Sequence, residues 1–236
     1  MRKTLLLISL LMCFAAIAGA VSIYDVQFTA SSGMDGTYPS RYTGKSLSLE
    51  GIVTATGYRD AGYFINERLN GPWRGILILD RSARIQTGDW VKVTGIVSEF
   101  YGMTCLQDIS QTRILSSNNP LPQPLLLTSG QLSRSDEAEA YEGVYVQLRN
   151  VTPSTGKTMR GKLPVTDGSG TCMVIADLFG AKIPSGNASQ YSSITGIVVY
   201  GFSEFALGPV TANDISIQQP KFIQNRSWGK IKSIYK

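Results

Sequence analysis

The stretch Val93-Thr-Gly-Ile-Val97, followed by Tyr101-Gly102, recurs later in the chain as Ile194-Thr-Gly-Ile-Val-Val-Tyr-Gly201. Self-similarity of this kind is typical of a chain that repeats one structural unit. Both copies are rich in β-branched residues, which favour strands over helices. The sequence therefore predicts two successive copies of one strand-rich unit.

The segments around Val93 predict the rest of the first unit. Leu47 to Ala55 alternates apolar and polar side chains, and two short apolar runs follow at hairpin spacing. The remaining segments expected to be strands are Gly62 to Asn66, Gly75 to Asp80, Trp90 to Val97, Met103 to Asp108 and Thr112 to Leu115. About five strands of this length make a small closed barrel.

The second unit repeats this order. Its expected strands are Tyr141 to Val151, Leu163 to Asp167, Cys172 to Ala176, Ile194 to Gly201, Phe205 to Pro209 and Asp214 to Ile217. A Pro-rich linker is expected near Asn118 to Pro124, and a short helix over Asp136 to Ala140.

Part of the chain resembles a known family. The matching segments are Ser22 to Phe28, Tyr42 to Lys45, Leu49 to Val53, Gly62 to Ile65, Gly71-Pro-Trp-Arg-Gly-Ile76, Gly88-Asp89 and Val93 to Gly102. They resemble the OB-fold modules of secreted bacterial proteins, which are often found beside extracellular nuclease or metallophosphoesterase domains. The resemblance covers residues 22–115, and residues 141–217 look like a divergent second copy without the Gly-Pro-Trp turn.

The resemblance implies an all-β chain of two tandem five-stranded OB-like Greek-key barrels with short connecting helical segments. It brings no catalytic residues with it. The expected division is a signal peptide over residues 1–20, a first OB-fold domain over 21–117, a linker and second OB-fold domain over 118–219, and a basic tail over 220–236.

The N-terminus has the pattern of a secretory signal. Arg2 and Lys3 precede an apolar run from Leu5 to Ile17, and Ala18-Gly19-Ala20 has the form of a cleavage site. The run is shorter than the ~20 residues that span a bilayer. We therefore expect a secreted, periplasmic or cell-surface protein whose mature chain begins at Val21 and has no integral membrane span.

The composition is globular and excludes several classes of enzyme. The chain has no histidine, which excludes Ser-His-Asp and Cys-His hydrolases and every imidazole base. Acids that could hold a metal are scattered singly, as at Asp80, Asp89, Asp167 and Asp177. We expect no enzyme, no cofactor and no metal; the alternative is a metal-dependent phosphodiesterase, because some OB-fold nucleases use metal-bound carboxylates and arginines.

Aromatic and basic residues are interleaved in the first unit, where single strands could stack on rings and meet guanidinium groups. The residues expected to bind are Tyr58, Arg59, Tyr63, Trp73 and Arg74. Acids such as Asp60 and Glu67 lie among them, so core packing with surface ion pairs is the alternative. Alternation also predicts that Tyr63 and Phe64 point to opposite faces of their strand.

The first hairpin of the second unit, Pro153 to Lys162, carries three further candidates without any acid: Lys157, Arg160 and Lys162. OB domains bind polymers with the loop between their first two strands. A plain solvated hairpin is the alternative. The hairpin is not a phosphate-binding P-loop, because Val151 stands where that motif needs glycine.

Charge is concentrated at the C-terminus. The last sixteen residues carry five basic residues and no acid, whereas residues 21–220 have 15 basic against 17 acidic residues. Because their net charge is close to zero, residues 21–220 lack the broad basic surface of a duplex-DNA binder. The tail could order on an anionic surface, serve as an anchor, or dock Trp228 on the second barrel.

Two cysteines remain after the signal, Cys105 and Cys172, one in each unit. Export would permit a disulfide between them if their Cα atoms lay within ~7 Å. Two buried thiols are the alternative.

These patterns predict an exported, non-catalytic binding protein whose partner is single-stranded nucleic acid or a similar extended polymer. The alternative of a different class is an envelope structural or adaptor module. Such a module would bind an envelope protein or a glycan and attach to it, or to an anionic surface, through the tail.

Overall fold

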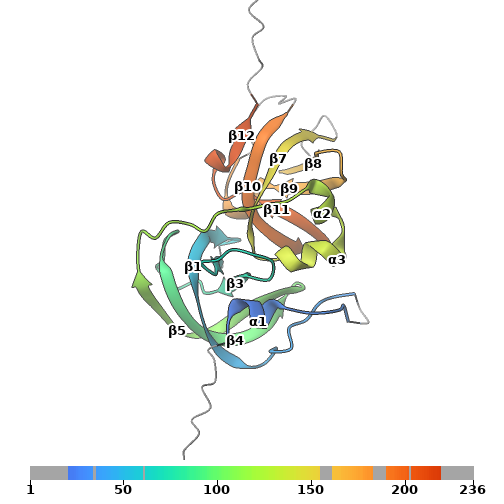
Figure 1. The fold of residues 1–236 in the computed structure, drawn as a ribbon. Coiled ribbons are helices and arrows are strands. Elements are labelled where there is room, and N and C mark those ends of the chain that lie inside the picture. Colours follow the sequence, from blue (N-terminus) through green and yellow to red (C-terminus); the bar gives the residue numbers. More distant parts are fainter. Residues whose placement is uncertain are drawn as a thin grey trace, which may run out of the picture.

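A computed structural model describes residues 21–33, 36–60, 62–154, 161–182, 190–201 and 203–218. Two strand barrels lie against each other in it, with only short helices beside them (Figure 1). The first barrel closes in the order β1-β2-β3-β5-β4. Its strands are β1 Ser46–Tyr58, β2 Gly62–Asn66, β3 Gly75–Leu79, β4 Trp90–Phe100 and β5 Met103–Ser116.

The second barrel repeats this topology. It runs β7-β8-β9-β11-β10 and closes where β10 pairs with β7. In both barrels the third and fifth strands are parallel, namely β3 with β5 and β9 with β11. The strands are β7 Tyr145–Pro153, β8 Lys162–Thr166, β9 Thr171–Ile175, β10 Tyr191–Gly201 and β11 Glu204–Gly208, with β6 Leu125–Leu126 and β12 Ile215–Ile217 at the edges. The prediction of two tandem five-stranded OB-like barrels is confirmed.

One strand differs from its expected form. The two segments expected between Met103 and Leu115 form the single strand β5. Its pairing with β4 shifts register opposite Gly95, and Asp108 there has a left-handed φ of 50°. A bulge of this kind lets a strand bend without ending.

The helices are short. They are α1 Ile23–Gln27, α2 Ser129–Ser133 and α3 Ser135–Ala138, with 3-10 turns η1 Glu139–Tyr141, η2 Ala176–Phe179 and η3 Ala212–Asp214. The helix expected over Asp136 to Ala140 corresponds to α3 and the start of η1. Helices α1 and α2 were not predicted, although Ser22 with Asp25 and Thr128 with Gln131 form capping boxes. No helix in the described ranges is long and apolar enough to cross a membrane.

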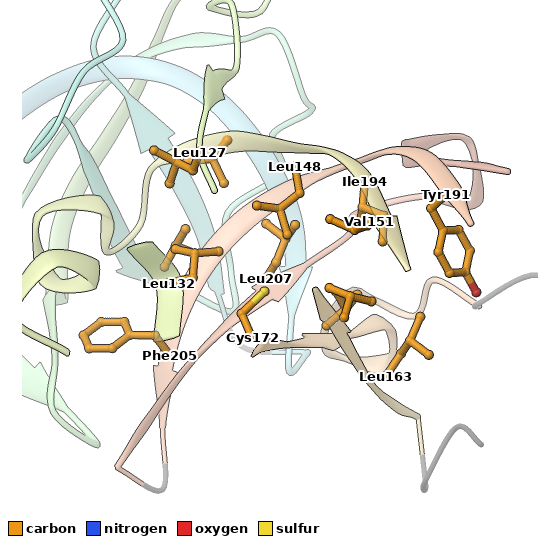
Figure 2. Close-up of a cluster of buried hydrophobic side chains, with 14 of the residues drawn as sticks. Leu127, Leu132, Leu148, Val151, Leu163, Cys172, Tyr191, Ile194, Phe205 and Leu207 are labelled. Atoms are coloured by element: carbon orange, nitrogen blue, oxygen red, sulfur yellow. The ribbon is translucent and has the colours of Figure 1, made fainter. Parts of the chain in front are cut away.

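A continuous apolar core fills the second barrel (Figure 2). Leu127 and Leu132, from the segment that leads into the barrel, complete this core. The labelled side chains from the barrel strands are Leu148, Val151, Leu163, Cys172, Tyr191, Ile194, Phe205 and Leu207.

The first barrel buries both faces of its hairpin. On β2, Tyr63 and Ile65 belong to the interior of the barrel, as alternation predicted, whereas Phe64 points outward. Phe64 pairs with Leu77 of β3, and both side chains are fully buried. The outward face is therefore covered by other parts of the molecule.

The second barrel provides that cover. A shared cluster joins Ala55, Tyr58, Phe64, Leu77 and Cys105 of the first barrel to Leu178, Ile197, Val199 and Ala206 of the second. The ring of Phe179 lies 5.9 Å from that of Phe64. At Gly143 a Cβ would lie 2.9 Å from the Gly75 carbonyl carbon, so the two backbones meet where only glycine fits.

The cysteines lie in different cores and form no disulfide. Cys105 belongs to the shared cluster and Cys172 to the interior of the second barrel, and both are free and buried. Burial raises the pKa of each thiol to about 12. Of the two alternatives left open by the sequence, the structure has the two buried thiols, and each cysteine acts as a small apolar side chain in a separate core.

The shared cluster predicts one cooperative unit. Replacing Phe64→Ala should destabilise the protein by about 3–5 kcal/mol, as for a fully buried aromatic ring, within a single unfolding transition. Chemical denaturation of residues 21–236, followed by fluorescence and circular dichroism, measures this change. Leu69→Ala is the control, because Leu69 is 80% exposed. Two separate transitions, with only one shifted, would contradict the shared core.

The thiols give a second prediction. Residues 21–236 prepared without reductant should alkylate at both cysteines after unfolding and at neither before it, because both thiols are buried. The melting temperature should not change on addition of reductant. Mass spectrometry measures how many cysteines are alkylated. Cysteines that stay unalkylated after unfolding would show that they form a disulfide.

Candidate ligand-binding site at the barrel junction

A cavity of about 310 Å³ opens where the two barrels meet. Its volume is at the lower end for small-molecule pockets. Both barrels contribute to its walls. The lining residues are Tyr58, Arg59, Lys162, Ile175, Asp177, Leu178, Val199, Tyr200, Gly201, Glu204 and Ala206.

The cavity lies among equivalent loops of the two barrels. Arg59 follows β1 in the first barrel, and Lys162 begins β8 after the matching loop of the second. Gly201 and Glu204 flank the turn between β10 and β11. OB folds bind their polymers with these loops between strands one and two and between strands four and five.

The fourth loop of this set reaches the same place. In the first barrel, Gly102 lies in the turn between β4 and β5, and a Cβ there would lie 2.6 Å from Cε1 of Tyr200. Glycine at this position lets the turn approach the Tyr200 ring. Residues next to the strand one–two and strand four–five turns of both barrels, namely Arg59, Gly102, Lys162 and Gly201, therefore lie around one junction.

Contacts with the second barrel fix Arg59. Arg59 and Asp60 have left-handed φ values of 48° and 53°, which make the tight turn after β1. The Arg59 N–H donates to the Leu178 carbonyl over 3.1 Å. Its guanidinium carbon lies 5.6 Å from the centroid of the Tyr58 ring, a cation–π contact.

The rim of the cavity carries both signs of charge. Arg59 and Lys162 supply two cations, and Asp177 and Glu204 supply two anions. Within the described part of the chain, none of the four forms an ion pair. All four residues are exposed, so a ligand could contact their charged groups.

The inner wall of the cavity is apolar. It is formed by Ile175, Leu178, Val199 and Ala206. Tyr58 is only 2% exposed, and burial raises its pKa, an effect that the nearby Arg59 opposes. An apolar wall below a charged rim suits a ligand with a flat apolar part and a charged part.

The residues predicted from the sequence separate into distinct places. Tyr58, Arg59 and Lys162 come together in the cavity. Tyr63 lies inside the first barrel at 2% exposure, so its ring is not available for stacking, and burial raises its pKa to about 12. Lys157 and Arg160 lie outside the described residues.

Trp73 and Arg74 belong to a different surface, which we call the aromatic platform: Tyr24, Phe28, Trp73 and Arg74. Tyr24 and Phe28 stack at 5.4 Å, and Trp73 meets Phe28 edge-on at 5.6 Å. The Arg74 guanidinium lies over Tyr24 and forms an ion pair with Glu67. The backbone N–H of Trp73 donates to the Ala140 carbonyl over 2.6 Å, which ties the platform to the second half of the chain.

Sequence reasoning missed Asp177, Tyr200 and Glu204 as cavity residues. Only one signal could have pointed to this region, the repeat of Tyr101-Gly102 as Tyr200-Gly201, because it marks equivalent turns in the two barrels. The distance between Asp177 and Arg59 along the chain hides their proximity in space.

Of the four acids noted as metal candidates, Asp80, Asp89 and Asp167 support turns, whereas Asp177 lines the cavity. Asp80 accepts hydrogen bonds from Ser82 and Ala83, and Asp89 accepts one from the N–H of Gln86. Asp167 accepts from Ser129 and from its own turn. Among the described residues, no group of three or more acids or cysteines is placed to hold a metal.

Buried carboxyl groups at the junction form a second unexpected feature. Glu142 is 3% exposed, and its Oε1 accepts from the Thr104 N–H across the barrels over 2.9 Å. Its Oε2 has no hydrogen-bond partner within the described ranges. Burial raises the pKa of Glu142 well above its usual value, and the nearby Glu139 adds to this rise. Burial also raises the pKa of Glu139 to about 8.

Comparisons with known proteins identify no family. The sequence matches no family model and no curated protein. Among solved structures, the p204 HINb domain aligns with 72% of this chain and 93% of its own, at 11% sequence identity and a TM-score of 0.30.

The buried carboxyl groups predict that stability falls as pH rises. Above the ordinary pKa of 4.5, the folded protein keeps protons on Glu139, whose pKa is about 8, and on Glu142, whose pKa is also raised, while the unfolded chain releases them. Glu142→Gln keeps the acceptor for Thr104 and cannot ionise. It should raise the melting temperature at pH 8 by a few degrees, since about 1 kcal/mol corresponds to about 2–4 °C here.

Glu137→Gln is the matched control, because Glu137 is ion-paired at the surface with Arg134. It should leave the slope of melting temperature against pH unchanged. Differential scanning calorimetry across this pH range measures both variants. A Glu142→Gln protein as sensitive to pH as the parent would contradict the assignment.

Proposed function

We propose that this chain is an exported, non-catalytic protein that binds single-stranded nucleic acid, or an extended polymer of similar chemistry, at the junction of its barrels. The observation that carries the proposal is that residues next to the strand one–two turns of both barrels and the strand four–five turn of the second line one cavity. Arg59 from the first barrel and Lys162 from the second provide cations on its rim, above an apolar wall.

The shape and charge of the site favour a single strand. A cavity of about 310 Å³ admits one unit of a polymer, which a single strand can present by turning out a base. A duplex keeps its bases stacked inside. The body of the chain is also nearly neutral, so affinity would come from local contacts more than from a broad basic surface.

The sequence just before Lys162 carries further basic residues. Lys157 and Arg160 precede it, with no acid between them. We infer from the sequence alone that these cations add to the attraction for a phosphate backbone.

Export is supported by the N-terminal sequence. The basic start, the apolar run and Ala18-Gly19-Ala20 are the parts of a secretory signal. We infer that residues 1–20 are removed and that the mature protein acts outside the cytoplasm, where a separate nuclease could be its partner. The basic tail over 220–236 would add an attachment to anionic surfaces.

A binding role, and not catalysis, is supported by the chain's own side chains. The sequence has no histidine to serve as a base. Asp80 and Asp89, the carboxylates that a metal-dependent phosphodiesterase would need, are engaged in turns.

A second candidate is an envelope adaptor that binds a glycan or a protein, and the aromatic platform favours it. Phe28 is 38% exposed and lies between Tyr24 and Trp73. Exposed rings of this kind supply large contact areas at binding surfaces. The adaptor would associate with cells through Trp73 and the tail and would be indifferent to oligonucleotides.

The proposed function predicts a specific loss of binding. The variant Arg59→Ala/Lys162→Ala should bind a labelled single-stranded oligonucleotide about tenfold more weakly. It should also lower the slope of log affinity against log salt by about 1.4, because each lost phosphate contact accounts for about 0.7. Fluorescence anisotropy with residues 21–236 at several salt concentrations measures both quantities.

Lys92→Ala/Arg113→Ala is the matched control, since it removes two cations that lie outside the cavity. Equal losses in the two double variants would mean that charge acts without a site. A chain ending at residue 220 should keep its binding. Binding that disappears with the tail would make the barrels a scaffold and support the adaptor.

A further inference from the structure

We propose that the junction cavity selects nucleotides whose base carries an exocyclic amino group, with Asp177 and Glu204 as the specificity-determining acceptors. The inference rests on the proposed function and names the ligand of the same site more closely. Among bases of equal size, cytosine should be preferred to uracil.

The carboxylates of the cavity are the starting point. Asp177 lies on η2 and Glu204 begins β11, so two separate elements bring their negative charges to one rim. Neither forms an ion pair with another described residue, although Arg59 and Lys162 line the same cavity. Two unpaired acids are unfavourable for a ligand that is itself anionic, unless they accept hydrogen bonds from it.

The position of Asp177 is set by the loop that leads to Lys162. The Ala176 N–H donates to the Gly161 carbonyl over 3.3 Å. A Cβ on Gly161 would lie 3.1 Å from Oδ2 of Asp177, so the missing side chain leaves room for that carboxylate. Gly161 also has a φ of 76°, which disfavours any other residue.

Hydrogen-bonding chemistry determines which base these carboxylates can bind. An ionised carboxylate can only accept hydrogen bonds, and the N4 amino group of cytosine donates to such an acceptor. Uracil has a carbonyl oxygen at the same position, which would face the carboxylate as a second acceptor. The two bases are otherwise alike in size and in the phosphates they bring.

The rest of the cavity orients the nucleotide. Arg59 and Lys162 come from different barrels and can each meet a phosphate at the rim. The apolar wall of Leu178 and Val199 would contact the flat face of the base, with Tyr200 beside it. The base edge is then left facing Asp177 and Glu204.

The test compares twelve-residue oligomers of deoxycytidine and deoxyuridine by anisotropy at pH 8, with residues 21–236. We expect about tenfold tighter binding of the cytosine oligomer, as one such base contact provides. The variant Asp177→Asn/Glu204→Gln should erase this preference without weakening the uracil oligomer, because amide groups can donate to the carbonyl.

Glu50→Gln/Glu137→Gln is the charge-matched control, since it also removes two carboxylates, and these pair with Lys92 and Arg134 away from the cavity. It should keep the preference. Equal affinity of the parent for both oligomers, or a preference that survives in the double variant, would overturn the inference. If both oligomers bind equally and their binding depends on Arg59 and Lys162, the inference is wrong and the proposed function is still supported. If neither oligomer binds, the proposed function and this inference are both wrong.

Discussion

Phe64 and Leu77 project from the outer face of the first barrel, where a lone barrel would leave them in water, and the second barrel buries both completely. Apolar burial of this kind is the main force that joins two folded units. This packing of the two barrels also shapes the candidate site. It covers the outer face of strands two and three in the first barrel, so the ligand of the proposed function would reach the site from the side of the loops. It also places Leu178 where its carbonyl holds Arg59.

Much of the fold could be predicted because its signals are local. The repeat of Val93 to Val97 as Ile194 to Val198 indicates two equal units, and alternation correctly divides Tyr63 from Phe64. The packing of one barrel on the other is not local. A hint does exist in Gly75 to Leu79, where four apolar residues follow one another without alternation, as in strands buried on both faces.

The candidate site was less predictable for the same reason. Sequence reasoning chose residues by their density in one segment, and the fold then separated Tyr63, Trp73 and Arg59 into a core, a surface platform and a cavity. The acids of the cavity come from late strands and turns. Burial of Glu142, with one oxygen unpartnered among the described residues, likewise depends on contact across the barrels. An acid so placed costs stability once ionised.

The proposed function requires that the ligand be held at the barrel junction. Photo-crosslinking of a single-stranded oligonucleotide containing 5-iodocytosine to residues 21–236, with peptide mapping, tests this claim directly. We expect crosslinks in peptides that contain Arg59 or Tyr200, which line the cavity from the two barrels. Crosslinks confined to peptides with Tyr24 and Trp73, or to residues 221–236, would contradict it.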